Sequence, residues 1–301
     1  MNTTTHKFDE LKYTIQGSPM QRIDDNILHQ YAVELWIKRD DCLHPIISGN
    51  KWRKLKYIID DLVDKPIDTI VSMGGAHSNH LHALAYLGQC LSIKTVGLIR
   101  GDSLQPLNAS LADMQSWGMQ LQAINRSDYR EMRYLGPQRF FADFNDRCYW
   151  LPEGGAQQQA LKGVAELLLE IPFDYDYLCV PCGSGTTVAG LAISAPLHTT
   201  ILGVCALKNT AGFLEHDINR LIGMRQATYC LINDYCLGGF AKTTPQLIDF
   251  IRNFTMKTHI PLEPIYTGKM LYAIYDLLKQ GYFPPGKRIV AVHTGGLQGL
   301  R

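Results

Sequence analysis

The first residue of this chain that could do chemistry is a lysine at the start of a predicted helix. Residues 48–52 read S-G-N-K-W, and apolar residues then recur at helical spacing as far as position 62. Asn50 is a favourable N-cap residue, which places Lys51 in the first helical turn. The helix dipole disfavours a cation there, so Lys51 is suited to act as an amine nucleophile. The alternative is an ordinary basic helix face, because Arg53 and Lys54 follow.

A second candidate is a glycine-rich loop between a predicted strand and a predicted helix. It consists of Gly183, Ser184, Gly185, Thr186 and Thr187. Backbone N–H groups at a helix start, with hydroxyls beside them, suit a phosphate, and glycine lets the backbone approach it. A dinucleotide fingerprint is disfavoured because its third glycine is missing, and no Walker ending occurs. A mononucleotide-sized phosphate is therefore favoured, and a loop that serves only packing is the alternative.

A third candidate is the segment 77–82, which holds three histidines and the pair Ser78-Asn79. No carboxylate or cysteine lies beside these histidines, and their spacing is not typical of a metal site. We therefore predict no metal. Ser78 is expected to cap the following helix, a position that also binds anions. The alternative is a capped helix with surface histidines.

The order of predicted elements explains how these segments meet. Strands are predicted at 33–39, 68–73, 95–99, 119–124, 147–151, 177–180, 200–205 and 288–292. Helices are predicted at 51–62, 81–90, 107–117, 129–144, 157–170, 188–194, 211–222, 245–256 and 268–279. Alternating strands and helices indicate an α/β fold with parallel sheets, whose functional loops follow the strand ends. Three polar, glycine-containing loops at such ends are 74–80, 182–187 and 293–296.

The composition limits the classes of function. The chain has 301 residues, 46% of them hydrophobic, and 29 basic residues against 28 acidic ones give a formal net charge of +1. This balance disfavours nucleic acid as a partner. No apolar run approaches the ~20 residues of a membrane span, and the polar N-terminus is unlike a targeting peptide. Eight scattered cysteines, the 179–182 C-x-x-C pair included, indicate reduced thiols in a cytoplasmic protein.

Six motifs in order give the chain a family resemblance over nearly its whole length. They are K-R-D-D at 38–41, G-N-K-W-R-K-L at 49–55, G-G with S-N-H at 74–80, the 183–187 loop, E-P-I-Y-T-G-K at 263–269 and H-T-G-G at 293–296. Together they resemble the D-cysteine desulfhydrase/1-aminocyclopropane-1-carboxylate deaminase family. These are fold-type II, tryptophan synthase beta-like enzymes that use pyridoxal 5′-phosphate.

The resemblance implies two domains, each with an open, mostly parallel sheet flanked by helices. The large, cofactor-binding domain would comprise residues 1–53 and 153–301. A small domain, residues 54–152, would be inserted in it. The family also implies a homodimer and a small amino acid as substrate.

The resemblance further implies roles for the candidate residues. Lys51 would be the lysine in Schiff-base linkage to the cofactor and the base at the substrate Cα. Asn79 would bond the pyridine 3′-oxygen, and Thr294 would face the pyridine nitrogen. The 5′-phosphate would be held by the 183–187 loop, with help from Lys54. Tyr266 would lie close to the ring.

Catalysis and substrate binding are assigned in the same way. Besides Lys51, the residues implied to be catalytic are Ser78 and Tyr266. Ser78 would bind the substrate carboxylate or act in proton transfer. Asn79 and His80 would complete the substrate-binding group.

The branch of the family is predicted from two threonines. Deaminases of the family resemble Tyr-Glu-Gly-Lys and His-Leu-Gly-Gly, where this chain has Thr267 and Thr294. A carboxylate that would keep the pyridine nitrogen protonated is thus replaced by hydroxyls, and a protonated ring is the stronger electron sink. Opening a cyclopropane requires more of that stabilisation than expelling hydrosulfide. We therefore predict β-elimination, most plausibly of D-cysteine to pyruvate, ammonia and hydrogen sulfide.

Three alternatives remain open. The first is 1-aminocyclopropane-1-carboxylate deaminase activity, which gives 2-oxobutanoate and ammonia and is compatible with Ser78 and Tyr266. The second is a nucleotide-binding oxidoreductase that uses the 183–187 loop. The third is an idle metabolite-binding protein with the same fold. The chain departs from the family pattern at Trp52, His77 and His82. The resemblance implies that these positions would surround the substrate rather than the cofactor.

Overall fold

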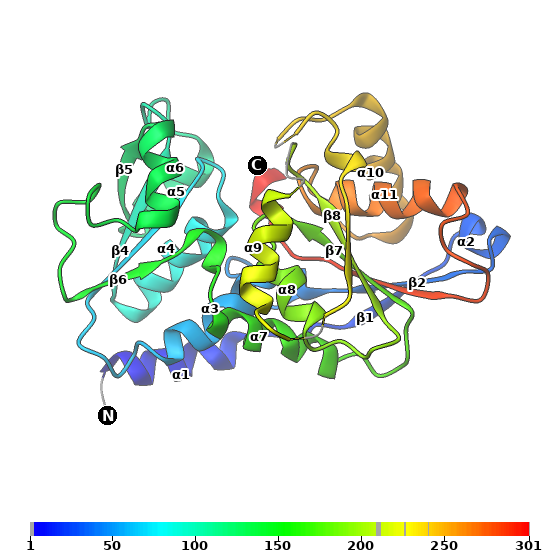
Figure 1. Ribbon diagram of the computed structural model, residues 1–301, viewed down its shortest axis with the longest axis horizontal. Coiled ribbons are helices and arrows are strands. Elements are labelled where there is room, and N and C mark those ends of the chain that lie inside the picture. Colours follow the sequence, from blue (N-terminus) through cyan, green and yellow to red (C-terminus); the bar gives the residue numbers. More distant parts are fainter. Residues whose placement is uncertain (1–2, 209–211, 226, 240, 301) are drawn as a thin grey trace. The chain divides into compact units, whose positions relative to one another are not determined.

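The chain forms two compact units, each with its own sheet. The computed structural model describes residues 3–208, 212–225, 227–239 and 241–300 (Figure 1). The first unit contains residues 3–16 and Leu43–Gly163, and the second contains Gly17–Cys42 and Val164–Leu300. Both sheets are mostly parallel and flanked by helices, so the predicted α/β class is confirmed. The chain passes from one unit to the other after residues 16, 42 and 163. The predicted domain boundaries lie at 53 and 152, and they stay a prediction.

The first unit is built on four parallel strands in the order β5-β4-β3-β6. They are β3 (Thr69–Gly74), β4 (Lys94–Arg100), β5 (Gln120–Ile124) and β6 (Cys148–Leu151). Successive side chains of β3 alternate between the two faces of the sheet. Ile70 belongs to the hydrophobic core that contains Leu84, whereas Val71 and Met73 belong to the core that contains Tyr129.

Six helices, the last of them shared with the second unit, and one 3₁₀ turn accompany this sheet in the described residues. They are α1 (Thr3–Thr14), α3 (Asn50–Asp60), α4 (Asn79–Leu91), α5 (Ala109–Ser116), α6 (Arg126–Leu135), η2 (Glu153–Gly155) and the first half of α7 (Gln158–Leu169), with a turn at residues 137–144 in place of helix. Helix α1 was not predicted. The predicted helix 129–144 was expected to break or bend at Gly136-Pro137. It ends at Leu135, because Gly136 adopts φ +79°, and it does not resume before residue 144.

Helix α3 is held against α7 by a backbone contact. A Cβ atom at Gly163 would lie 1.9 Å from the carbonyl oxygen of Arg53. No side chain fits at that distance, so only glycine allows the two helices to approach this closely. The contact fixes the helix that carries Lys51.

The second unit is built on six strands in the order β1-β2-β10-β7-β8-β9. They are β1 (Met20–Ile23), β2 (Glu34–Lys38), β7 (Tyr177–Cys182), β8 (Thr200–Cys205), β9 (Tyr229–Ile232) and β10 (Arg288–Val292). All neighbours are parallel except β1 and β2. The edge strands β1 and β9 were not predicted.

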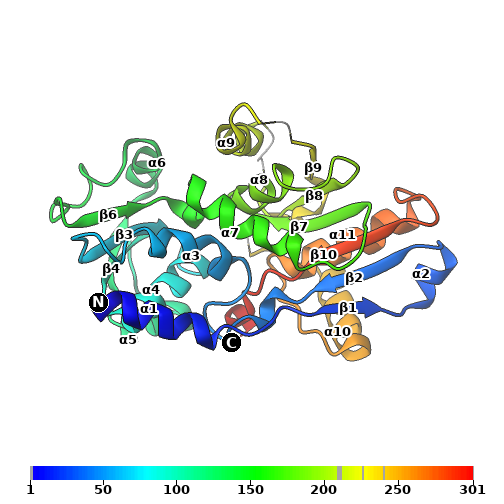
Figure 2. The same cartoon turned by 90° about the horizontal axis from the view of Figure 1, so that it is seen from below.

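Helices cover both faces of this sheet. They are α2 (Asn26–Gln30), the end of α7, α8 (Thr186–Ala192), α9 (Phe213–Ile222), α10 (Pro245–Thr258) and α11 (Thr267–Lys279), with 3₁₀ turns η1 (Asp40–Cys42), η3 (Asp234–Cys236) and η4 (Leu297–Leu300). Leu202 and Val204 of β8 share a core with Met270 of α11, whereas a Cβ at Gly203 would meet Val188 of α8. Figure 2 shows α8 and α10 on opposite sides of the sheet.

Two predicted segments fall partly outside the described residues. The predicted helix 211–222 begins at residue 211, and the poorly readable stretch 226–241 includes 226 and 240. Within the described ranges, no helix has the length and apolar character needed to cross a membrane.

Candidate active site, one unit at a time

The first turn of α3 places Lys51 as predicted, but by a different cap. Gly49, with φ 60° and ψ −140°, occupies the N-cap position and makes no side-chain cap bond. The predicted N-cap role of Asn50 is therefore wrong, because the positive φ of Gly49 lets the helix start one residue earlier. Asn50 is the first helical residue, and its Oδ1 accepts a hydrogen bond from the ammonium of Lys51. Lys54, one turn further on, is buried.

The start of α4 carries Ser78, Asn79 and His80 on consecutive positions. Ser78 is the N-cap, and its Oγ accepts a hydrogen bond from the N–H of Leu81 at 3.2 Å, so this prediction is confirmed. A Cβ at Gly74 would lie 2.6 Å from that Oγ, which explains why β3 ends in glycine. Backbone N–H groups of a first helical turn suit a carboxylate.

His80 is a buried, uncharged base. Its side chain is 3% exposed, and its Nε2 lies 2.9 Å from Oγ of Ser72. Ser72 in turn donates to the carbonyl oxygen of Leu151 at 2.7 Å. Burial lowers the pKa of His80 to about 3, with a further lowering from the ammonium groups of Lys51 and Lys54. The sequence analysis did not identify Ser72. The one available signal was a single hydroxyl side chain within an apolar strand.

The three histidines of this segment do not converge. His82 is buried, and its Nε2 lies 2.9 Å from Oδ2 of Asp113, while its ring packs edge-on against Trp117 at 4.6 Å. The alternative of surface histidines is therefore wrong for His80 and His82. Among the residues that the structure describes, no group of three or more His, Cys, Asp or Glu side chains could hold a metal ion.

In the second unit, the 183–187 loop leads from β7 into α8. Gly185 occupies the N-cap position with φ +76°, and no side chain caps the helix. A Cβ at Gly185 would lie 2.4 Å from Cγ1 of Ile218, so the position requires glycine. The hydroxyls of Ser184 and Thr186 lie 3.1 Å apart. A turn of this kind, with hydroxyls and a helix start that no side chain caps, is suited to a phosphate.

Tyr266 packs on this loop. A Cβ at Gly183 would lie 3.2 Å from Cε1 and 3.4 Å from the hydroxyl oxygen of Tyr266. The ring therefore lies against bare backbone, and the loop and Tyr266 form one continuous surface. Both belong to the second unit.

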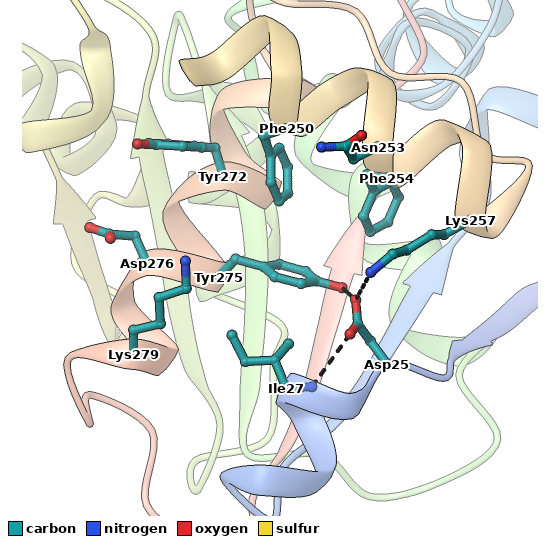
Figure 3. Close-up of a pocket in the computed structure, with 10 residues that line it drawn as sticks. All are labelled: Asp25, Ile27, Phe250, Asn253, Phe254, Lys257, Tyr272, Tyr275, Asp276 and Lys279. Atoms are coloured by element: carbon teal, nitrogen blue, oxygen red, sulfur yellow. Dashed lines mark hydrogen bonds and ion pairs between the residues drawn. The ribbon is translucent and has the colours of Figure 1, made fainter.

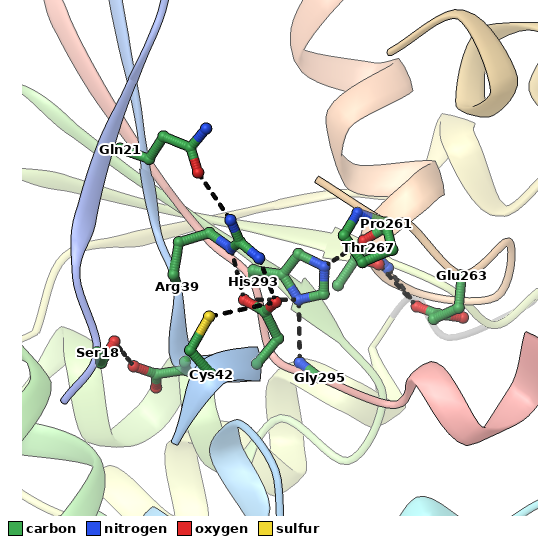
Figure 4. A network of polar contacts seen from close by, with 11 residues as sticks. Ser18, Gln21, Arg39, Cys42, Pro261, Glu263, Thr267, His293 and Gly295 are labelled. Carbon is green, nitrogen blue, oxygen red and sulfur yellow. Dashed lines mark hydrogen bonds and ion pairs between the residues drawn. The ribbon is translucent and has the colours of Figure 1, made fainter. Parts of the chain in front are cut away.

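Glu263, which sequence reasoning quoted only as part of a motif, fixes Tyr266. Its buried carboxylate accepts hydrogen bonds from the N–H groups of Ile265 and Tyr266 at 2.7 and 2.9 Å. It also accepts from the N–H and the hydroxyl of Thr267 at 2.6 and 3.1 Å (Figure 4). Burial raises the pKa of Glu263, and these four donors oppose that shift. The carboxylate thus caps the start of α11 and holds the Tyr266 backbone.

The loop after β10 is organised by His293, beside the predicted Thr294. His293 Nε2 lies 2.7 Å from the carbonyl oxygen of Pro261, and the N–H of Gly295 donates to Nδ1 at 3.2 Å (Figure 4). Because a carbonyl only accepts, Nε2 carries the proton and Nδ1 is a lone pair. The 3.6 Å separation between Nδ1 and Asp41 is then no ion pair. Asp41 pairs with Arg39 instead, at 2.9 and 2.7 Å.

Two further kinds of polar group are a buried lysine and the cysteines. Lys269, from the same motif as Tyr266, donates to the carbonyl oxygens of Cys236 and Gly239 at 2.7 and 2.8 Å, and burial lowers its pKa. The eight cysteines are all free, and Cys179 and Cys182 are buried.

A hollow of about 280 Å³ in the second unit does not involve the predicted site (Figure 3). Its walls are aromatic side chains of α10 and α11 that pack edge to face, such as Phe250 with Tyr275 at 5.2 Å. Asp25 at its rim caps α2 and accepts from the Tyr275 hydroxyl at 3.3 Å, with Lys257 3.7 Å away. None of the predicted site residues lines this hollow.

Comparison with known proteins identifies the family. Residues 11–295 match the family described as pyridoxal-phosphate dependent enzyme. The chain belongs to this family. The enzyme's cofactor is therefore pyridoxal phosphate, as predicted.

The relatives agree with the resemblance. A Pyrococcus furiosus protein, provisionally named a 1-aminocyclopropane-1-carboxylate deaminase, is 28% identical over 97% of this chain and 93% of its own. A mitochondrial Arabidopsis thaliana protein is 28% identical over 89% of this chain and 74% of its own, and is named a bifunctional D-cysteine desulfhydrase/1-aminocyclopropane-1-carboxylate deaminase. A solved structure described as an ACC deaminase homologue shares the fold, with a TM-score of 0.76 and 24% identity over 97% of this chain and 95% of its own.

The residues of each unit suit the cofactor. In the second unit, the bare Gly183 backbone against Tyr266 and the start of α8 form a cradle that a Cβ would fill. In the first unit, Lys51 supplies an amine on a helix start, and Lys54 a buried cation beside it. The part that each predicted residue plays toward the cofactor stays a prediction.

Proposed function

We propose that this lyase catalyses β-elimination on a small amino acid, with D-cysteine as the favoured substrate. The products would be pyruvate, ammonia and hydrogen sulfide, formed with consumption of one water. The observation that carries the proposal is the start of α11, where Thr267 stands in place of a glutamate. Its hydroxyl donates to Glu263 and its side chain is fully buried, so it offers no negative charge.

The chemical consequence follows from the charge at this position. Bound pyridoxal phosphate supplies a ring that withdraws electrons from the substrate Cα. Without a carboxylate to keep its nitrogen protonated, that ring withdraws less strongly. Loss of a good leaving group tolerates this better than opening of a carbon ring. Glu263 does not replace the missing carboxylate, because its two oxygens already accept hydrogen bonds from four donors.

The first unit would supply the proton-transfer and carboxylate-binding groups. Lys51 would remove the Cα proton and hold it on Nζ. The helix start at Ser78 and Asn79 would bind the substrate carboxylate, because the first-turn N–H groups point outward. Lys54 adds positive charge in the same unit.

The second unit would hold the phosphate and orient the ring. Backbone groups and hydroxyls of the 183–187 loop would bind the phosphate, and Tyr266 would lie beside the ring. Thr294, held by the His293 turn, would offer a neutral hydroxyl to the ring nitrogen.

The test is a substrate panel on the purified enzyme. Sulfide release from D-cysteine, L-cysteine and related β-substituted amino acids would be measured beside 2-oxobutanoate release from the cyclopropane acid. We expect D-cysteine to react fastest. Activity on the cyclopropane acid without sulfide release from D-cysteine would overturn the proposal.

The role of Lys51 has its own test. Lys51→Ala is expected to lose the absorbance band of the bound cofactor and about 10³-fold in turnover. Lys56→Ala, a lysine on the same helix, is the matched control and should keep both. An unchanged spectrum in Lys51→Ala would refute the linkage.

The second candidate is 1-aminocyclopropane-1-carboxylate deaminase activity. It is favoured by the names of the relatives, one of which carries both activities in its name. Thr267→Glu distinguishes the two, because a restored carboxylate should favour ring opening over sulfide release. We also propose a homodimer in the cytoplasm, which light scattering and cell fractionation would test.

A further inference from the structure

The contact between Ser72 and His80 determines which ring nitrogen carries the proton. The Ser72 hydroxyl has one proton, and the Leu151 carbonyl 2.7 Å away can only accept. Ser72 therefore donates to Leu151 and accepts from His80 at 2.9 Å. Nε2 carries the ring proton, and Nδ1 carries a lone pair.

That lone pair has no partner in the described residues. His80 Nδ1 is buried and makes no hydrogen bond. The ring cannot avoid this by taking a second proton, because its pKa is lowered to about 3 by burial and by Lys51 and Lys54. A buried acceptor without a donor is unfavourable, and a catalytic role is one of the explanations for such a group in a native structure.

The surroundings indicate what kind of donor would complete it. Lys51 and Lys54 are the charges that act on the ring, and both come from α3. A Cβ at Gly155 would lie 3.7 Å from both His80 Cε1 and Lys54 Cβ, so the ring edge and the lysine stem flank the same glycine. A lone pair repels an anion, so a carboxylate or phosphate would not be the partner. An amine is the reacting group that carries N–H donors.

We propose that Ser72 locks His80 as an uncharged hydrogen-bond acceptor, and that Nδ1 receives an N–H from an amine of the reaction. Two sources share this chemistry: Nζ of Lys51 and the amino group of the substrate. The proposal rests on the proposed function, since it names a specificity contact of that site. His80 orients the amine without adding negative charge, so Lys51 keeps its tendency to give up a proton. Ser72 is a positioning residue that acts through His80.

The test is ¹⁵N NMR of the full-length holoenzyme with labelled histidine. His80 should show a protonated Nε2 and an unprotonated Nδ1 from pH 5 to pH 8. D-Alanine, which has no leaving group, is one arm and propionate, which has no amine, is the other. A shift of Nδ1 with D-alanine but not with propionate identifies the substrate amine as the donor. A shift on Lys51→Ala alone identifies Lys51. A protonated Nδ1, or no shift in any arm, overturns the proposal.

Kinetics of three variants add a second readout. Ser72→Ala should populate the other tautomer and lower kcat/KM about tenfold, the effect of one lost hydrogen bond in the transition state. The loss should lie in KM if the substrate is the donor and in kcat if Lys51 is. His80→Gln, which keeps a neutral donor and acceptor, should retain more activity than His80→Leu. Equal losses in these two would overturn the proposal.

Controls separate this role from folding and from the proposed function. Ser116→Ala removes a hydroxyl that bonds only the Asp113 carbonyl, and it should change neither the NMR signals of His80 nor kcat/KM. If no amino acid of the panel reacts while Nδ1 still shifts with D-alanine, then the proposed function fails and the acceptor role stands.

Discussion

Two buried histidines with the same tautomer behave differently. His293 in the second unit and His80 in the first are 1% and 3% exposed, and both carry the proton on Nε2. His293 is complete, because Nε2 donates to Pro261 and Nδ1 accepts from Gly295. His80 is half complete, because its Nδ1 has no partner among the residues that the structure describes.

On our proposal, the difference separates a histidine that serves the fold from one that takes part in the reaction. A saturated ring holds two backbone segments together, and everything it can bond is already in the fold. An unsaturated ring keeps one acceptor for something else. The same reasoning applies to Glu263, whose four donors make it a saturated carboxylate. Burial alone does not distinguish a saturated side chain from an unsaturated one. The distinction lies in how many of its polar atoms already have a hydrogen-bond partner.

The largest effect is expected from His293→Leu. Both the Pro261 carbonyl and the Gly295 N–H would lose their partner, so the free energy of unfolding should fall by about 3 kcal/mol. Urea denaturation measures this. His198→Leu, at an exposed position of the same unit, is the control and should change little. A loss below about 1 kcal/mol would mean that His293 is not a saturated structural group.

The stability of the protein at acid pH should reveal that His80 stays uncharged in the folded state. Its pKa is about 3 when folded and 6.5 in the reference state, so the unfolded chain binds the proton first as pH falls. The free energy of unfolding should decrease by about 1.4 kcal/mol per pH unit below 6.5, or about 2 kcal/mol at pH 5. Urea denaturation at pH 7 and pH 5 would show this in the wild type. His80→Gln should remove that component, and an equal loss in both proteins would contradict it.

Thr267→Val tests saturation at Glu263. The variant keeps the side-chain volume but removes one of four donors, so the free energy of unfolding should fall by about 1 kcal/mol. Thr267→Ser keeps the hydroxyl and is the matched control. Equal stability of the two variants would show that three backbone donors are enough for this carboxylate.

The smallest stability effect is expected from His80→Leu at pH 7. Only the bond to Ser72 is lost, and Ser72 still donates to Leu151, so the free energy of unfolding should change by less than about 1 kcal/mol. Turnover should fall nevertheless. A large loss of stability would instead make His80 a structural residue like His293.

Much of the fold could be predicted because it depends on local pattern. The parallel strands are apolar runs, and the helix starts at Ser78 and Gly185 carry their signals nearby. Helix α1 was missed because it is largely polar, with only Phe8 and Leu11 buried. Strand β1 was missed because four residues at a sheet edge carry little pattern.

The helix starts that carry Lys51 and Ser78 could be predicted, whereas the contacts that support them could not. Lys51 and Ser78 lie where local signals put them, whereas the partner of Ser72 lies 79 residues further along the chain. No spacing rule reveals a contact of that range. The donors that bond Glu263 lie two to four residues further along the chain. A Glu-Pro sequence nevertheless does not predict that the carboxylate faces the start of the following helix.

The alignment of two strands has a chemical effect. Ser72 of β3 is the register partner of Leu151 at the end of β6. A slip of one residue between these strands would present a different carbonyl, and the serine hydroxyl would be released to point toward the imidazole instead. Deleting a single residue from β6 could then move a proton from one ring nitrogen to the other. The protonation pattern of this enzyme is thus encoded in how its backbone is paired, at a position that no list of active-site residues would include.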